Sequence, residues 1–376
     1  MLLDYETLRV IWWALIGILL IGFALTDGFD MGVAALLPAV ARNDGQRRQV
    51  INTVGPVWEG NQVWLILGGG AIFAAWPALY AVTFSGFYLA MILVLSAFIL
   101  RPVAFKFRSK RPDAAWRARW DAVLCYAGVL PPLIFGVALG NVLQGVPFHF
   151  DTDLRPFYTG SFFGLLNPFA LLCGLVALSM LVMHGATYLQ LKADGEPMER
   201  ARRYGVAAAV AVIVLFAAGG IWIANMDGYQ LLTTMDPHGP SNPLRKEMTL
   251  TAGYWLQNFR DMPLLWLAPA AGLLGALLAA VGLATRRGAW SFIGSKLSVT
   301  GIIATVGVTM FPVILPSSTH PAHSLMVWDS SSSHTTLWIM LICTAIFLPI
   351  VLFYTAWVYK VLWGRVSESD VTKDMY

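Results

Sequence analysis

Charged residues are scarce in this sequence. Asp, Glu, Lys and Arg make up 12% of its 376 residues, whereas an ordinary soluble domain has about 25%. Hydrophobic residues make up 57%, and they form repeated runs of the roughly 20 residues that a helix needs to cross a hydrocarbon core of ~30 Å. The alternating segments typical of a membrane β-barrel are missing. The composition therefore excludes a soluble domain and predicts an all-α, polytopic integral membrane protein.

Cysteine is also rare, and its spacing excludes two kinds of site. Cys125, Cys173 and Cys343 lie in apolar segments without a C-x-x-C pair, so neither a disulfide framework nor a zinc site is indicated. The net charge of +4 comes from basic residues spread over short loops. This distribution indicates membrane topology rather than nucleic-acid binding. Asp4 and Glu6 make the start of the chain acidic, unlike a cleavable signal, so we expect the first helix to be retained.

Nine apolar runs predict about nine transmembrane helices. Their expected ranges are 10–40, 50–76, 79–104, 120–144, 161–190, 204–226, 262–285, 289–315 and 336–362. Alternate connections, together with the C-terminal tail that contains Lys373, hold most of the 25 Lys and Arg residues. The opposite side holds only Arg9, Arg155, Arg245, Lys246 and Arg260. Because cytoplasmic loops are enriched in Lys and Arg, we expect a periplasmic N-terminus and a cytoplasmic C-terminus.

The chain has no Pro- or Ser-rich linker and no low-complexity tract. Residues 1–376 are therefore predicted to form a single transmembrane domain, with 226–261 as the longest periplasmic connection. Another outer loop, PSSTHPAHSLMVWDSSSSH, carries three histidines without metal-ligand spacing. We expect this second loop to be solvated.

Two carboxyl groups lie inside the first apolar run, in the stretch ALTDGFDMG. Asp27 and Asp30 are three residues apart and share a helix face. A third carboxyl group, Glu59, follows in GPVWEGNQVWLILGGG, inside the second predicted helix. Counted from Arg42 and Arg48 in the intervening basic loop, Asp30 and Glu59 lie at depths of ~18 Å and ~16 Å. We therefore expect Asp30 and Glu59 to face each other, with Asp27 about one turn deeper.

These acids admit two interpretations. A charged carboxylate at the bilayer centre costs ~2.5 to 3.5 kcal/mol, so such groups usually face a bundle interior or water and serve proton or ion pathways. Alternatively, they are neutral groups that join helices through hydrogen bonds to Thr26, Asn61 or Gln62. Gly28 and Gly32 form a GxxxG step, which predicts the close approach of another helix.

His184, in LVMHGATYLQL, is the only histidine within a predicted helix. Its neighbour Met183 points about 100° away, so the two side chains cannot ligate one iron from a regular helix. The pattern favours a structural histidine over a haem ligand.

Several longer strings point to a family. They are TDGFDMG, WEGNQVWL, GGGAIFAAWPALY, FSGFYLAMILVLSAFILRPVAF, GNVLQGVPF, NPFALL, GATYLQLK, FPVILPSS and WDSSSS. From about Asp4 to Arg365, the chain resembles subunit II of the cytochrome bd-type quinol oxidases. The resemblance implies two four-helix bundles plus one extra helix, in the bacterial cell inner membrane.

The resemblance also implies a division of labour between subunits. In the family, subunit I carries two b-type haems, one d-type haem and the loop that oxidises quinol. The complex oxidises ubiquinol or menaquinol and reduces dioxygen to water, and a small single-helix subunit often accompanies it. Subunit II is expected to ligate no haem, and in some members it holds a structural quinone.

Asp27 and Asp30 in TDGFD, and Glu59 in WEGNQVW, match family positions that are thought to deliver cytoplasmic protons to the oxygen-reducing haem. Such delivery would build a membrane potential without pumping. Some relatives carry Asp at position 59 and an amide at position 184. Two other functions stay open: a purely structural scaffold for subunit I, and an ion-coupled secondary transporter. Against the transporter, no corresponding pair of Gly/Pro-broken helices occurs in the two halves of the chain.

Overall fold

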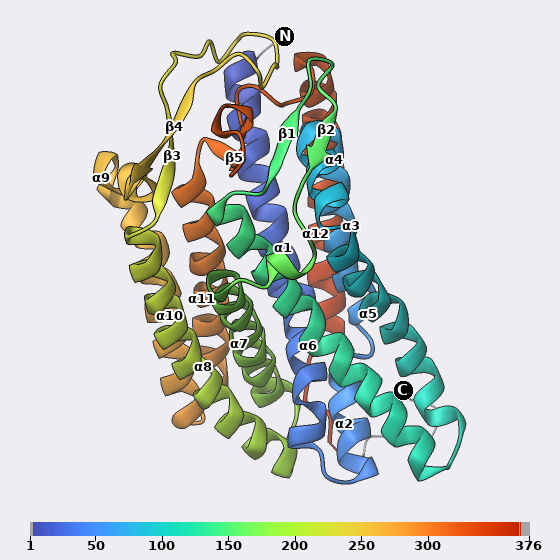
Figure 1. Ribbon diagram of the computed structural model, residues 1–376. Coiled ribbons are helices and arrows are strands. Elements are labelled where there is room, and N and C mark those ends of the chain that lie inside the picture. Colours follow the sequence, from blue (N-terminus) through green and yellow to red (C-terminus); the bar gives the residue numbers. More distant parts are fainter. Residues whose placement is uncertain (1–2, 368, 370–376) are drawn as a thin grey trace.

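The computed structural model describes residues 3–367 and 369, and it shows long helices running side by side between two ends (Figure 1). We call the end that holds the short strands the strand end. The opposite end, which holds α2 (Asp44–Val54) and the connection between α5 and α6, is called the basic end. Lys373, which the sequence places in the C-terminal tail, lies outside the described residues.

The first four-helix bundle is built around α1. It consists of α1 (Tyr5–Val40), α3 (Trp58–Ala75), the pair α4 (Pro77–Gly86) and α5 (Tyr88–Phe107), and α6 (Ala114–Gln144). Helix α1 packs against α3 and α6, and α6 packs against α5. A Cβ atom on Gly128 of α6 would lie 2.3 Å from the Ala35 nitrogen of α1. Small residues therefore let these backbones touch, as is typical of membrane helix packing.

The second bundle contains α7 (Pro168–Lys192), α8 (Gly195–Ala224), α10 (Leu267–Ala284) and α11 (Gly288–Met310). Helix α7 joins the two bundles because it packs on both α1 and α6. Helix α12 (His334–Val361) lies outside both bundles, against α1 and α3, and of its residues Leu337 alone is buried. The structure thus has two four-helix bundles and one extra helix, and the predicted all-α polytopic fold is confirmed.

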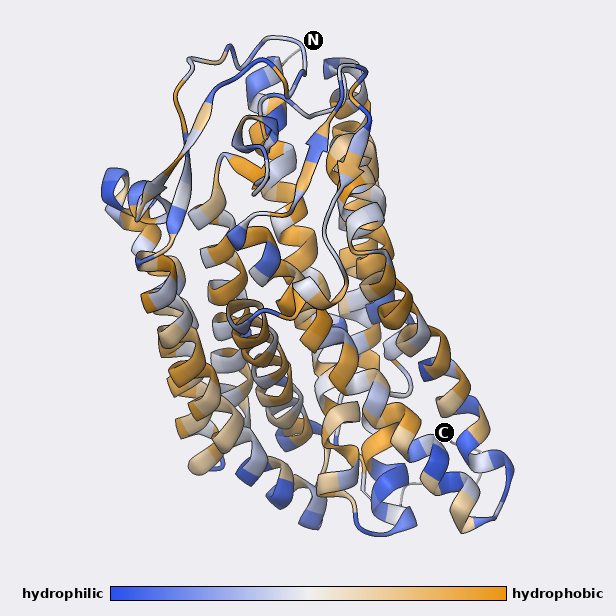
Figure 2. Ribbon diagram, in the orientation of Figure 1, coloured by the Kyte–Doolittle hydropathy of each residue, from blue (hydrophilic) through white to orange (hydrophobic). Residues whose placement is uncertain are grey.

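Eight helical segments of the described chain are long and apolar enough to cross a membrane. The remaining expected helix corresponds to α3. It is not apolar enough to count among these segments, because its first turns contain Glu59, Asn61 and Gln62. Figure 2 shows apolar residues along the middle of the helices and hydrophilic residues at both ends. This distribution is the one that a bilayer requires.

The predicted helix boundaries differ from the structure where Gly or Pro interrupts the backbone. The predicted helix over 50–76 divides into α2 and α3 at Gly55 and Pro56, and the one over 79–104 divides at Phe87. The helix predicted from 161 begins at Pro168, behind the N-cap Asn167, whose side chain accepts from the Ala170 amide. The helix predicted to reach 315 ends at Met310, before Pro312. Proline removes a backbone donor and restricts the residue before it, which accounts for the ends at Pro56, Pro168 and Pro312. The break at Phe87 directly follows Gly86.

Three short antiparallel strand pairs cover the strand end. They are β1 (Phe148–Phe150) with β2 (Pro156–Tyr158), β3 (Asp227–Leu231) with β4 (Met248–Ala252), and β5 (Val313–Leu315) with β6 (Leu325–Met326). The other short elements are α9 (Gln257–Asp261) and the 3-10 turns η1 (Arg108–Lys110), η2 (Phe163–Leu165), η3 (Tyr254–Leu256), η4 (Pro263–Trp266) and η5 (Pro321–His323).

Buried charges tie the connections at the strand end to the helices. Arg9 of α1 donates to the Pro237 carbonyl oxygen at 2.5 Å and to Ser331 Oγ at 2.8 Å. Lys246 Nζ lies 2.6 Å from Asp329 Oδ2. Burial raises the pKa of Asp329 and lowers that of Lys246, and the attraction between the two groups offsets part of both shifts.

A second ion-pair network lies at the basic end. Arg108 Nε donates to Asp121 Oδ1 at 2.5 Å, and Arg47 Nη1 reaches Asp121 Oδ2 at 2.8 Å. The Arg108 side chain also reaches Asp44 at 3.0 Å. These contacts tie α2 to α6 and to the end of α5, so the connection that leads into α3 is held firmly against the first bundle.

Candidate functional site

The candidate site lies where α1 meets α3, α5, α7 and α12. The closest of these approaches involves Gly32 of α1, where a Cβ atom would lie only 1.9 Å from the Leu181 carbonyl oxygen of α7. A Cβ atom on Gly185 of α7 would lie 2.4 Å from the carbonyl carbon of Gly32. The close helix approach predicted from the glycine step of α1 is therefore present, with α7 as the partner.

Asp27 forms a buried ion pair with Arg101 of α5. Arg101 Nη2 donates to Asp27 Oδ1 at 2.6 Å and Nη1 donates to Oδ2 at 3.1 Å, and the two side chains are 1% and 0% exposed. The guanidinium carbon also lies 5.1 Å from the Phe98 ring centroid. The bidentate pair joins two charges in a setting where either alone would be very costly. Among the described residues, Arg101 Nε is buried and has no hydrogen-bond partner.

Sequence reasoning missed Arg101 as a partner of Asp27. Its place in FILRPVAF, near the end of an apolar run, groups it with the basic loop that follows. In the structure, α5 continues past it to Phe107, so the side chain lies within the bundle. An arginine one and a half turns inside the end of an apolar helix is the signal that points to such a pair.

Asp30 is 2% exposed and has a different partner. Asn61 Nδ2 of α3 donates to Asp30 Oδ2 at 2.8 Å, and the Tyr359 hydroxyl of α12 donates to Asn61 Oδ1 at 2.7 Å. The other carboxyl oxygen, Oδ1, is buried and has no hydrogen-bond partner in the described part of the chain. Three helices thus meet at one carboxyl group.

The expectation that Glu59 faces Asp30 is wrong. Glu59 is exposed at the surface of the chain, in the first turn of α3, while Asp30 is buried against Asn61. The reason is the helical period: Asn61 is two residues after Glu59, so the two side chains point about 200° apart. The amide faces α1, and the carboxyl group of Glu59 therefore faces outward.

Of the other polar side chains expected to satisfy the acids, only Asn61 does so. The Thr26 hydroxyl donates to the Gly22 carbonyl oxygen of its own helix at 2.8 Å. Gln62 is partly buried on α3, and no hydrogen bond joins it to either aspartate among the described residues. Threonine commonly bonds back to its own helix in this way, which removes it as a partner for Asp27.

His184 is fully buried and both of its ring nitrogens are engaged. Nε2 lies 3.1 Å from the Leu25 carbonyl oxygen, and Nδ1 lies 2.8 Å from Ser295 Oγ. The ring stacks on Phe292 at a centroid distance of 5.3 Å. Neither nitrogen is free to bind iron, so His184 joins α7 to α1 and α11. Within the described residues, no group of three His, Cys, Asp or Glu side chains is placed to hold a metal ion.

With this geometry in view, comparison with known proteins decides the family. A sequence profile described as "Cytochrome bd terminal oxidase subunit II" matches residues 8–362. The chain belongs to this family. It is therefore subunit II of a bd-type terminal oxidase, an oxidoreductase complex, and a multi-pass bacterial membrane protein.

Relatives of this subunit align over its full length. It is 49% identical to the "Cytochrome bd-I ubiquinol oxidase subunit 2" of Escherichia coli K12, over 100% of this chain and 99% of the relative. A "Probable cytochrome oxidase subunit 2" of Haemophilus influenzae is also 49% identical, with the same coverage. The "Cytochrome bd ubiquinol oxidase subunit 2" of Bacillus subtilis is 31% identical over 97% of this chain and 98% of the relative.

The fold also matches a solved structure. A chain of the bd oxidase from Geobacillus thermodenitrificans superposes with a TM-score of 0.71, covering 95% of this chain and 98% of that chain at 15% identity. The resemblance read from TDGFDMG, WEGNQVWL and the other strings is confirmed by these comparisons.

Proposed function

We propose that this subunit helps to supply protons to the oxygen-reducing haem of its partner, through Asp27, Asp30 and Glu59. The observation that supports the proposal most directly is the charge count of the buried cluster. One guanidinium, that of Arg101, faces two carboxyl groups, and it forms its bidentate pair with Asp27. A proton on Asp30 makes the cluster neutral, and within the described part of the chain no hydrogen-bond partner occupies Asp30 Oδ1. Asp30 is thus the member of the cluster best suited to gain and lose a proton.

The direction of proton supply depends on which end of the subunit faces the cytoplasm. We infer that the basic end faces the cytoplasm and the strand end faces the periplasm, because Lys and Arg are concentrated in cytoplasmic loops. Asp30 lies ten residues before Val40, the last residue of α1 at the basic end. This distance is ~15 Å along a helix. The acids would therefore receive their protons from the cytoplasm.

The exposed face of α3 is the surface we assign to subunit I. Glu59 lies on this face together with Val63, Ile66 and Phe73, at intervals of four, seven and fourteen residues. A carboxylate left in lipid is costly, so protein or water must cover Glu59. The neighbouring helix α12 adds further exposed apolar side chains, namely Ile339, Ile342, Ile346, Phe347, Ile350, Phe353, Tyr354 and Trp357. A partner that covers α3 and α12 would bring its own groups to Glu59.

In this arrangement the partner would hold the redox groups. We assign the two b-type haems and the d-type haem to subunit I, since the one buried histidine of this chain has both nitrogens engaged. When bound there, the haems pass electrons from quinol to dioxygen. Reduction of one dioxygen to two waters takes four electrons and four protons, and two quinols supply those electrons. Quinol protons released at the periplasmic face and cytoplasmic protons taken up through this subunit would build a membrane potential without pumping.

We propose that a structural quinone binds where the second bundle faces α6 of the first. A cavity of about 440 Å³ lies between α6, α7, α8, α10 and α11. Its walls include Leu139, Phe169, Phe216, Leu273 and Ile302. These apolar side chains fit an isoprenoid tail, which would fill the space between helices. A small single-helix subunit is a further partner expected for the complex.

Replacement of Glu59 by glutamine tests the proposed function. In the assembled complex, we expect Glu59→Gln to slow oxygen consumption per haem strongly, because the amide keeps the size of the side chain but cannot carry the proton. The reduced-minus-oxidised haem spectrum should be unchanged. Glu247→Gln, at an exposed position of the strand end, is the matched control and should turn over normally.

The two alternatives give different results in the same experiment. If Glu59→Gln leaves turnover at the wild-type rate, the chain is a structural scaffold and the proton-supply proposal is wrong. If the chain alone transports a solute without a haem-bearing partner, the transporter interpretation replaces both.

A further inference from the structure

Helix α12 reaches the buried acids through one residue. Most of α12 is exposed, but Tyr359, in its last turn, is half-buried and points toward α1 and α3. Its hydroxyl donates to Asn61 Oδ1 at 2.7 Å, and its ring meets the Phe29 ring edge-on at a centroid distance of 6.4 Å. Tyr359 is therefore the contact by which α12 acts on Asp30.

The Tyr359 bond fixes the orientation of the Asn61 amide. An amide offers one accepting oxygen and two donating N–H groups. Because the tyrosine hydroxyl donates to the Asn61 oxygen, the amide nitrogen is left to donate to Asp30 Oδ2. Without that hydroxyl, the amide is free to turn and present its oxygen to Asp30, which only a protonated carboxyl group can satisfy. The Tyr359 hydroxyl thus determines whether the Asn61 amide presents its N–H group or its oxygen to Asp30.

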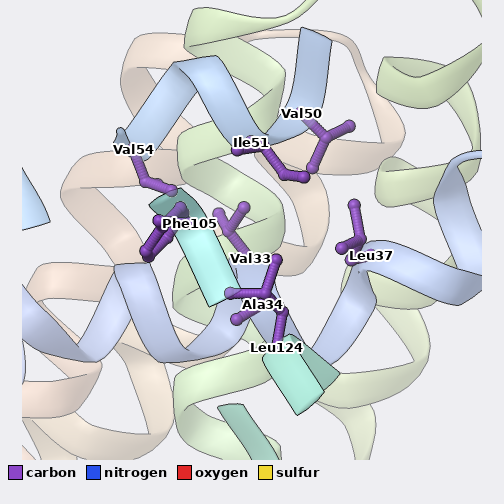
Figure 3. Close-up of a pocket in the computed structure, with 8 residues that line it drawn as sticks. All are labelled: Val33, Ala34, Leu37, Val50, Ile51, Val54, Phe105 and Leu124. Atoms are coloured by element: carbon purple, nitrogen blue, oxygen red, sulfur yellow. The ribbon is translucent and has the colours of Figure 1, made fainter. Parts of the chain in front are cut away.

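One space inside the first bundle, near the basic end, is lined by apolar side chains. The space lies between α1, α2, α5 and α6 and has a volume of about 10 Å³. Figure 3 shows the side chains that line it, namely Val33, Ala34, Leu37, Val50, Ile51, Val54, Phe105 and Leu124. A buried water needs two to four polar partners, and such an apolar space stays dry. This space therefore gives protons no path to Asp30. The seam between α1, α3 and α12, which contains Tyr359 and Asn61, provides polar groups.

We infer that Tyr359 is a positioning residue for proton transfer: its hydroxyl holds Asn61 in the orientation that Asp30 needs in order to exchange a proton. This inference rests on the proposed function. It makes the C-terminal helix part of the proton-transfer site, in addition to its place on the surface assigned to subunit I.

Replacement of Tyr359 by phenylalanine removes the hydroxyl and keeps the ring. The loss of one neutral hydrogen bond in the transition state slows a reaction by about three- to tenfold. We therefore expect Tyr359→Phe to lower oxygen consumption per haem by this factor. The solvent deuterium isotope effect on turnover should increase, because proton transfer becomes the slower step. Tyr126→Phe is the matched control: this membrane tyrosine of α6 also bonds a side chain, Ser96 Oγ at 2.8 Å, away from the acids.

A second variant tests whether Tyr359 acts through Asn61. Asn61→Ala should slow turnover at least as much as Tyr359→Phe, and adding Tyr359→Phe to Asn61→Ala should cause no further loss. If Tyr359→Phe gives no assembled complex, Asn61→Ala alone decides the matter, and wild-type turnover in that variant overturns the inference.

The inference and the proposed function can fail separately. If Asp30→Asn slows turnover while Tyr359→Phe changes neither the rate per haem nor the isotope effect, only the role of Tyr359 is wrong. If Asp30→Asn also leaves turnover unchanged, the proposed function itself is wrong. A loss of haem with unchanged turnover per haem would show that Tyr359 serves assembly alone and would also overturn the inference.

Discussion

The ion pair between Asp27 and Arg101 makes a quantitative prediction about stability. Both side chains are almost completely buried, and two hydrogen bonds of 2.6 and 3.1 Å join them. Replacing Arg101 with methionine keeps much of the side-chain volume and leaves the Asp27 carboxylate buried without its cation. Breaking a buried pair from one side costs about 3 to 5 kcal/mol, which lowers the folding equilibrium constant by roughly two to four powers of ten.

The double variant Asp27→Leu/Arg101→Met separates the cost of an unpaired charge from a loss of packing. Replacing both members of a buried pair with apolar residues is often close to neutral, so we expect the double variant to be much more stable than Arg101→Met. The free energy of unfolding in mixed micelles, measured by denaturant titration of the purified complex, gives both values. Wild-type stability in Arg101→Met, or a double variant that loses as much as the two single variants together, would refute the reasoning.

Two further perturbations test other parts of the structure. Gly185→Ala should destabilise the subunit by about 1 to 3 kcal/mol, because the new Cβ atom would lie 2.4 Å from the Gly32 backbone. Gly17→Ala on α1 is the control and should not destabilise the subunit, since nothing lies within 4 Å of the new Cβ atom. Equal unfolding midpoints for the two variants would contradict this prediction. At the strand end, the Phe150 amide donates to His323 Nδ1 at 3.0 Å, and burial, aided by nearby cationic groups, lowers the pKa of His323 below 6.5. The contribution of neutral His323 to the stability of the folded protein should thus be complete above pH 6.5 and lost as the pH falls toward the folded-state pKa. His323→Asn keeps a hydrogen-bond acceptor but does not titrate, so it should flatten the pH dependence of hydrogen exchange at the Phe150 amide. Equal pH profiles in the two proteins would show that another group titrates.

The membrane helices were predictable from the sequence, because they follow from local quantities, and the depth of the acids stays a prediction from the same quantities. Hydrophobic run length identifies a membrane helix, and helix rise converts a residue count into a depth. The glycine step of α1 likewise predicts close packing without naming the partner. These signals lie within one segment of the chain each, so no long-range contact has to be known.

Asn61 was among the partners that the sequence suggested for the acids, but two other contacts of the cluster were not predictable in this way. Asp27 is paired with Arg101, 74 residues away, and Asn61 is bonded to Tyr359, 298 residues away. Which face of α3 turns toward α1 depends on the break at Gly55 and Pro56 that separates α2 from α3. The prediction of a continuous helix over 50–76 gave the wrong direction for the Glu59 side chain. Tertiary packing, and not periodicity, decides such faces.

Exposure of Glu59 also changes how the three acids are related. The sequence predicted that Asp30 and Glu59 face each other, with Asp27 about one turn deeper. The structure instead buries the two aspartates and exposes Glu59 at the surface of the chain. An outward carboxyl group in a membrane helix is understandable when a partner subunit covers it. The arrangement accordingly favours transfer across the surface between subunits.

The most direct test of proton supply is the turnover of the assembled oxidase with Asp30→Asn. The amide keeps the shape and the hydrogen bond to Asn61 but cannot release a proton, and the loss of a positioned proton-transfer group typically costs about 10²-fold or more. We expect oxygen consumption per haem to fall by about this factor while the reduced-minus-oxidised spectrum stays that of the wild type. Wild-type turnover in a complex with its full haem content would contradict the account.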